Sequence, residues 1–97
     1  MPQPGLQPTP QAAGLVIIPA YCEESRIESV LARVRESIPT WDVLVVDDGS
    51  DDDTPSVARR AGARVVSLPF NLGYGGALQT GFRYAVVGEY EQIGLHE

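Results

Sequence analysis

The sequence contains no lysine, and its seven basic residues are all arginines scattered from Arg26 to Arg83. Thirteen acidic residues bring the formal net charge to −6. A protein that binds the nucleic-acid backbone needs a concentrated positive surface, so this composition disfavours that class. We therefore expect no nucleic-acid partner.

Cysteine and histidine are equally scarce. The single cysteine, Cys22, cannot form an intramolecular disulfide, and the single histidine, His96, leaves no Cys/His cluster with zinc spacing. No apolar run approaches the roughly 18 residues of a membrane span, and the amino terminus lacks the basic and apolar segments of a secretion signal. These absences predict a cytoplasmic chain, with association at a membrane surface left open.

The chain is organised around residues 42–54, where four consecutive apolar residues lead into five aspartates within seven positions. A continuous apolar run predicts a strand buried on both faces, as in a parallel sheet covered by helices. Asp47 and Asp48 would then lie at the carboxyl end of a central strand, where open α/β sheets bind their ligands. The aspartates at 51–53 are interpreted as caps of the following helix.

Strand and helix signals alternate three times along the chain. Strands are expected at 14–18, 43–46, 64–68 and 92–95, and helices at 25–38, at 54–61 and from the glycine-rich loop to Gly88. This alternation implies right-handed crossovers and predicts an α/β fold with a Rossmann-like parallel sheet. Residues 1–13, rich in proline and glutamine, are expected to be a disordered leader, and 14–97 to form the folded part.

Local signals place the boundaries of these elements. Pro19 should end the first strand because it cannot donate to a ladder. Ser25 and Glu28 have the spacing of a capping box, and Thr54 should cap the second helix. The buried face of the third helix is expected to contain four residues, Leu78, Phe82, Ala85 and Val86.

Several residues could carry chemistry. Adjacent carboxylates at a strand end can accept hydrogen bonds from a nucleobase, from ribose hydroxyls or from metal-bound water. Tyr21 could stack on a flat base, and Glu23 could fix that base or cap the first helix, although each type of residue is commonly structural. The loop from Gly73 to Gly76 permits close backbone approach and could point a helix amino end at an anion. It matches neither the Walker loop nor the dinucleotide fingerprint.

Three blocks stand out by their order and spacing, at 16–24, 45–54 and 71–82. Together they resemble family 2 glycosyltransferases of the GT-A fold, most nearly the dolichyl- or polyprenyl-phosphate sugar transferases. The resemblance implies a UDP- or GDP-linked sugar donor held by the first half of the domain. It also implies an acceptor such as a polyprenyl or dolichyl phosphate.

The resemblance further implies which residues bind the nucleotide. Tyr21 and Glu23 would line the base pocket with Pro19, and Asp48 would accept a hydrogen bond from the base. The full implied set is Pro19, Tyr21, Glu23, Asp47, Asp48, Gly73, Gly75 and Gly76.

In the full family domain a divalent metal, Mg or Mn, held by an Asp-x-Asp element, stabilises the departing diphosphate. That element is absent after Leu95, and Cys22 stands where the family usually has asparagine. We therefore predict neither a catalytic nor a metal-binding residue in this chain. It resembles the amino-terminal, nucleotide-binding half of a GT-A domain and is expected to be inactive alone.

Two other functions remain open. The unfinished fourth strand suggests a non-catalytic nucleotide-binding or interaction module completed by another chain, because an unpaired sheet edge invites pairing or self-association. The run Val45 to Asp48 also suggests a phospho-receiver-like domain. Receivers, however, carry their paired acids after the first strand and use a lysine, which this sequence lacks.

Overall fold

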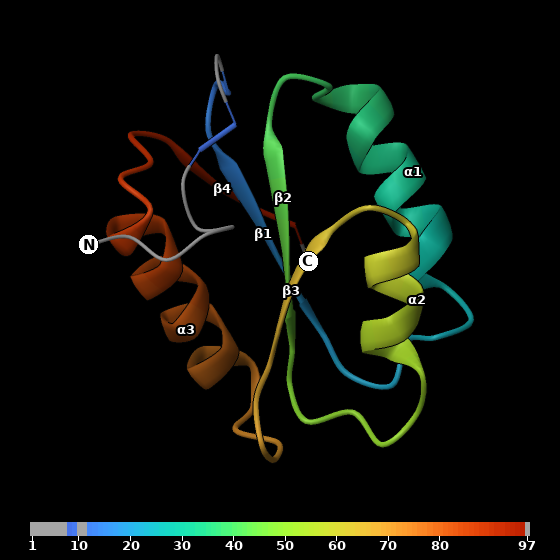
Figure 1. Cartoon of the computed structure of the whole chain (residues 1–97). Helices are drawn as coiled ribbons and strands as arrows, with labels where there is room; N and C mark the ends of the chain where they lie inside the picture. Colours follow the sequence, from blue (N-terminus) through green and yellow to red (C-terminus); the bar gives the residue numbers. More distant parts are fainter. Residues whose placement is uncertain (1–7, 10–11, 97) are drawn as a thin grey trace.

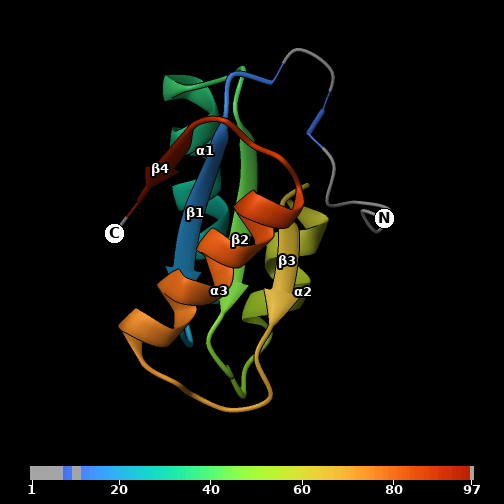
Figure 2. The same ribbon diagram turned by 90° about the vertical axis from the view of Figure 1, so that its left-hand side faces the viewer.

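The computed structural model describes residues 8, 9 and 12–96. Its core is a four-stranded parallel sheet in the order β3-β2-β1-β4, with α1 and α2 on one face and α3 on the other (Figures 1 and 2). This arrangement confirms the predicted α/β class and parallel sheet. The elements are β1 (Leu15–Ala20), α1 (Ile27–Ser37), β2 (Asp42–Asp47), α2 (Thr54–Arg60), β3 (Arg64–Ser67), α3 (Tyr74–Val87) and β4 (Ile93–Leu95).

The two central strands each contain a run of four apolar residues, at 15–18 and 43–46, because both of their faces are covered. Alternate residues of β1 and β2 enter two separate clusters. The cluster against α1 and α2 contains Val16, Ile18, Val43 and Val45 from these strands. The cluster against α3 contains Leu15, Ile17, Leu44 and Val46.

β1 continues through Pro19 to Ala20, so the predicted end of the strand at Pro19 is wrong. The carbonyl of Ile17 accepts a hydrogen bond of 3.1 Å from the amide of His96, which shows that Ile17 faces the β4 side. Pro19, two residues further on, faces the same side, where β4 has already ended. Its missing N–H therefore leaves no ladder bond unmade.

The starts of the first two helices also differ from prediction. No side chain caps α1, so the capping box expected at Ser25 and Glu28 is wrong. Instead, the carbonyl of Glu23 accepts hydrogen bonds from the amides of Arg26 and Ile27, at 2.9 and 2.8 Å. In α2, Thr54 is the first helical residue and not the cap. Its hydroxyl is free for other bonds because it does not cap the helix.

The buried face of α3 matches the predicted one only in part, because Ala85 is buried and Leu78 packs against the adjacent cluster as expected, whereas the other two predicted residues do not. Ala77, Gly81 and Ala85 are its buried residues, whereas Phe82 and Val86 are 39% and 72% exposed. Small residues at four-residue spacing let the helix lie close to the sheet, since a Cβ added at Gly81 would lie 2.5 Å from a side-chain carbon of β1. Close approach, not the bulk of the side chain, selects this face.

Part of the predicted leader contacts the sheet. The amide of Thr9 donates to the carboxylate of Asp42 at 2.8 Å, and the amide of Ala13 donates to the carbonyl of Thr40 at 2.9 Å. Residues 1–7 and 10–11 lie outside the described residues, so disorder of the leader stays a prediction. In the part of the chain that the structure describes, no helix has the length and apolar character needed to cross a membrane.

Candidate functional site

The loops that follow β1, β2 and β3 meet at the carboxyl edge of the sheet, at the bottom of Figure 1. The turn after β2 and the loop after β3 touch at Gly49, which has a φ of 76°. A Cβ at this position would lie 2.4 Å from the carbonyl carbon of Phe70. Both the conformation and the close approach therefore require glycine there.

Asp48 joins these loops. It is 4% exposed, and its two carboxylate oxygens accept hydrogen bonds from the amides of Leu72 (2.7 Å) and Gly73 (3.0 Å). Its own amide donates to the carbonyl of Ala20 at 2.8 Å, and its carbonyl accepts from the side chain of Asn71 at 3.3 Å. One buried aspartate thus ties the end of β1 to the glycine-rich loop.

Asp47 serves a different loop. It is 2% exposed and accepts a hydrogen bond of 3.0 Å from the amide of Ser50, which closes the turn after β2. Successive strand residues point to opposite faces of a sheet, and Val45 packs against the α1 and α2 side. Asp47 therefore lies on that side, whereas Asp48 lies on the α3 side. The two adjacent carboxylates do not act as a pair.

The loop after β1 is held by the start of α2. The hydroxyl of Thr54 accepts a hydrogen bond from the amide of Glu23 at 2.8 Å and donates to Asp52 at 2.5 Å. Asp52 also accepts from the amide of Thr54, the first residue of α2, but the N-cap residue is Asp53 and no side chain makes a capping bond there, so the interpretation of residues 51–53 as helix caps is wrong. The hydrogen bonds from Thr54 hold the pKa of the Asp52 carboxyl below its usual range.

Cys22 lies in the same junction and has a φ of 51°, in the left-handed region. Its amide donates to the hydroxyl of Ser50 at 2.8 Å, and its thiol lies 3.4 Å from a carboxylate oxygen of Asp51. Asparagine tolerates left-handed backbone better than most residues. Cys22 therefore holds a conformation that the asparagine implied by the family resemblance would adopt with less strain.

A cleft of about 250 Å³ lies at this edge, on the side of Asp48. The residues that line it are Pro19, Ala20, Tyr21, Asp48, Asn71, Gly73 and Tyr74. The rings of Tyr21 and Tyr74 are half exposed, at 49% and 51%. Interaction with the neighbouring Cys22 side chain is the main cause that raises the pKa of Tyr21, so its phenol is neutral near pH 7.

Four of the eight predicted nucleotide-binding residues therefore meet in one cleft: Pro19, Tyr21, Asp48 and Gly73. Sequence reasoning missed Ala20, Asn71 and Tyr74 as lining residues. Asn71 and Tyr74 belong to the glycine-rich block at 71–82, so their position in that block was the available signal.

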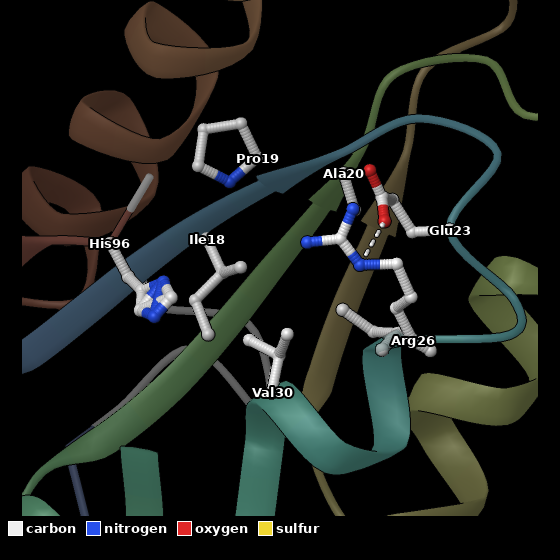
Figure 3. A pocket seen from close by; sticks show the side chains of 8 residues that line it. Ile18, Pro19, Ala20, Glu23, Arg26, Val30 and His96 are labelled. Atoms are coloured by element: carbon white, nitrogen blue, oxygen red, sulfur yellow. Dashed lines mark ion pairs between the residues drawn. The ribbon is translucent and has the colours of Figure 1, made fainter. Parts of the chain in front are cut away.

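Glu23 lies elsewhere. It lines a smaller pocket of about 80 Å³ on the α1 side of β1, together with Ile18 and Val30 (Figure 3). Its carboxylate pairs with the guanidinium of Arg26 at 3.6 Å, at one rim of this pocket. His96 stands at another side of the pocket, and its Nδ1 is buried without a hydrogen-bond partner among the described residues. Pro19 and Ala20, at the end of β1, border both cavities. Glu23 lines only the smaller pocket and Tyr21 lines only the cleft, so these two side chains lie on different sides of the strand end.

The remaining predicted glycines lie in the first turn of α3. Gly73, the residue before the helix, has a φ of 87°, and a Cβ at Gly76 would lie 2.7 Å from the side chain of Leu72. A Cβ at Gly75 would meet nothing within 4 Å. Conformation requires glycine at Gly73 and packing requires it at Gly76, but neither requires it at Gly75.

The described residues do not fit a metal ion. Over 8, 9 and 12–96, no group of three or more His, Cys, Asp or Glu side chains converges in the manner of metal ligands. The hydrogen bonds give the reason, since Asp47, Asp48 and Asp52 each direct an oxygen at a different backbone amide, those of Ser50, Leu72 and Thr54.

Known proteins share both the sequence blocks and this fold. Two curated relatives are each 38% identical to this chain. They are a dolichyl-phosphate beta-glucosyltransferase of Drosophila melanogaster, matched over 80% of this chain and 29% of the relative, and an undecaprenyl-phosphate mannosyltransferase of Micrococcus luteus, matched over 81% and 35%. The chain thus spans about a third of the length of these relatives.

Solved structures agree. A mannosyltransferase from Pyrobaculum calidifontis, in complex with GDP-Man and Mn²⁺, matches 88% of this chain and 26% of its own with a TM-score of 0.69 and 32% identity. Glucosyl-3-phosphoglycerate synthase from Mycobacterium tuberculosis, in complex with UDP, matches 69% of this chain and 27% of its own with a TM-score of 0.60 and 38% identity.

The family model for glycosyl transferase family 2 matches residues 15–90. This range includes the three paired strands β1, β2 and β3 and every loop of the cleft, but not β4. The chain belongs to glycosyl transferase family 2.

Proposed function

We propose that this chain binds the nucleotide of a UDP- or GDP-linked sugar in the cleft beside Asp48, and so provides the donor-binding part of a family 2 glycosyltransferase. The observation that carries this proposal is the cleft itself, where four of the eight residues implied by the family resemblance meet. Two structural relatives support it because they are complexes with GDP-Man and with UDP.

The chemistry of the cleft suits a nucleobase. The half-exposed ring of Tyr21 offers an aromatic face for stacking. Each oxygen of Asp48 accepts one amide hydrogen bond, and a carboxylate oxygen has a second lone pair, so Asp48 can also accept from the imide N–H of a base. Gly75 leaves open space at the start of α3, which allows the ligand to approach the backbone.

The proposed acceptor is a lipid phosphate of the polyprenyl or dolichyl type, reached at a membrane surface from the cytoplasm. The names of the Drosophila and Micrococcus relatives support this choice. Such an acceptor is already anionic, so its attack on the sugar needs little help from a general base.

We expect a divalent Mg or Mn ion to act in the full-length domain, as the Mn²⁺ in the Pyrobaculum complex suggests. When bound, such an ion would neutralise charge on the departing diphosphate. The described residues of this chain do not fit that ion. We therefore predict that the chain alone binds the nucleotide but shows no measurable sugar transfer.

Calorimetric titration of the chain with UDP and GDP, with and without manganese, tests this function. We expect saturable binding that depends on the nucleotide and changes little with manganese. Circular dichroism would first establish that the chain is folded. A folded chain that binds neither nucleotide would contradict the proposal, and so would metal-dependent turnover with a nucleotide-sugar and polyprenyl phosphate.

The edge of β4 favours a second candidate, an interaction module completed by another chain. β4 pairs with β1 and with no other described strand, and Ile93 and Leu95 are 39% and 49% exposed. An unpaired edge beside apolar side chains promotes strand pairing. Sedimentation over a wide concentration range should show self-association in this case, whereas a monomer at every concentration would exclude pairing between copies.

A further inference from the structure

We propose that Tyr74 forms a second aromatic wall of the cleft and that the nucleobase lies between Tyr74 and Tyr21, an inference that rests on the proposed nucleotide binding. Both rings line the same cleft, and each is about half exposed. They come from different segments, since Tyr21 follows β1 and Tyr74 begins α3. Asp48 lies between these segments, hydrogen-bonded to both.

The four tyrosines of the chain divide into two groups. Tyr84 and Tyr90 pack against the apolar cluster under α3, and the hydroxyl of Tyr90 also donates to Asp42 at 2.5 Å. Tyr21 and Tyr74 belong to neither apolar cluster. Packing therefore explains the first pair of tyrosines but not the pair in the cleft.

The backbone around Tyr74 is fixed before any ligand binds. The residue before it, Gly73, donates its amide to Asp48 at 3.0 Å, and the carbonyl of Gly73 accepts from Ala77 at 3.1 Å in the first turn of α3. Tyr74 is thus anchored through its neighbour to the same buried carboxylate that we propose contacts the base. Fixed backbone positions on both sides of the cleft reduce the entropy lost when the rings are ordered.

The chemistry of tyrosine points to the base and not to the diphosphate. A neutral phenol ring adds no positive charge for phosphate groups, whereas its face stacks on any nucleobase. Removal of a stacking ring typically weakens binding by about 5- to 150-fold. We expect a loss of this size when Tyr74 is replaced by alanine, and the loss should be confined to ligands that contain a base.

The experiment is calorimetric titration of the whole chain and of three variants, Tyr74→Ala, Tyr74→Phe and Phe70→Ala, with UDP, GDP and ribose 5-phosphate. Phe70 is the matched control, since it is an aromatic residue in the loop that leads into α3, is 64% exposed and does not line the cleft. We expect Tyr74→Ala to weaken UDP and GDP binding at least fivefold, while Tyr74→Phe and Phe70→Ala stay within twofold of the original chain. Ribose 5-phosphate should bind all four proteins equally.

Two results would overturn the inference while leaving nucleotide binding intact. One is a Tyr74→Ala variant that binds UDP and GDP as well as the original chain. The other is a Tyr74→Phe variant that loses as much affinity as Tyr74→Ala, which would assign the effect to the hydroxyl and not to stacking. If the original chain binds neither nucleotide, the proposed function fails and the inference fails with it.

Discussion

Replacement of Asp48 with asparagine should destabilise the chain as well as weaken nucleotide binding. The carboxylate of Asp48 is 4% exposed and accepts amide hydrogen bonds of 2.7 and 3.0 Å through separate oxygens. An asparagine has one acceptor oxygen, so its NH₂ group must face one of these two amides. One hydrogen bond is lost and one buried amide is left without an acceptor.

The size of the effect follows from these two terms. A hydrogen bond to a charged group contributes about 1.5–3 kcal/mol, and a buried donor without a partner costs about 1–3 kcal/mol. Because relaxation of the loop recovers part of this sum, we expect Asp48→Asn to lower the free energy of unfolding by about 2–4 kcal/mol. That is a large fraction of the roughly 5–15 kcal/mol that stabilises a typical domain.

Urea unfolding measures this loss. Trp41 is the single tryptophan and packs against the cluster under α1, so its fluorescence reports loss of the core. With a slope of about 1–3 kcal/mol per molar urea, the midpoint for Asp48→Asn should fall by roughly 0.7–4 M. Asp47→Asn is the matched control, because Asp47 accepts one amide bond that an asparagine oxygen can keep. Equal midpoints for Asp48→Asn and the original chain would refute the reasoning.

Three further predictions concern conformation, packing and pH. Gly49→Ala should unfold at a clearly lower temperature, because it places a Cβ 2.4 Å from the backbone of Phe70 at a φ of 76°, and an unchanged melting temperature would contradict this. Gly75→Ala should raise stability by up to about 1 kcal/mol, since its Cβ meets nothing within 4 Å, whereas Gly81→Ala should lower it, and urea midpoints that move in the same direction would oppose the packing argument. Burial raises the pKa of Asp42, but hydrogen bonds and a nearby arginine outweigh burial and leave this pKa lowered. The stability that the Asp42 carboxylate contributes is therefore present above the unfolded pKa and is lost as pH falls through the folded pKa. The original chain should lose more stability between pH 6 and pH 3 than Asp42→Asn, and equal losses would contradict this.

The two central strands could be predicted from sequence because each contains an uninterrupted run of four apolar residues, at 15–18 and 43–46, a signal that does not depend on neighbours. The buried face of α3 could not be predicted from apolar spacing alone. Phe82 and Val86 fit that spacing, yet Gly81 is selected because a distant strand approaches the helix closely. The end of β1 could not be predicted for a similar reason, because it also depends on a distant strand. Pro19 is tolerated within β1 only because β4 ends before it reaches Pro19.

The candidate site shows the same limit. Sequence blocks placed Tyr21, Asp48 and Gly73 in one site because the ends of parallel strands share an edge. The sequence blocks did not reveal that both carboxylate oxygens of Asp48 accept hydrogen bonds from the glycine-rich loop, whose donating amides lie 24 and 25 residues further along the chain. They also placed Glu23 with the base, although its side chain pairs with Arg26 in a separate pocket.

These contacts divide the cleft into residues that build it and residues that face a ligand. Asp48 is buried and holds the loops together, so changes there should alter stability and affinity together. Tyr21 and Tyr74 are half exposed outside the apolar core, so changes there should alter affinity with little effect on unfolding. A plot of affinity loss against stability loss for single substitutions should therefore separate the tyrosines from Asp48. If all three fall on one line, binding is lost only because the fold is lost, and the tyrosines do not contact the base.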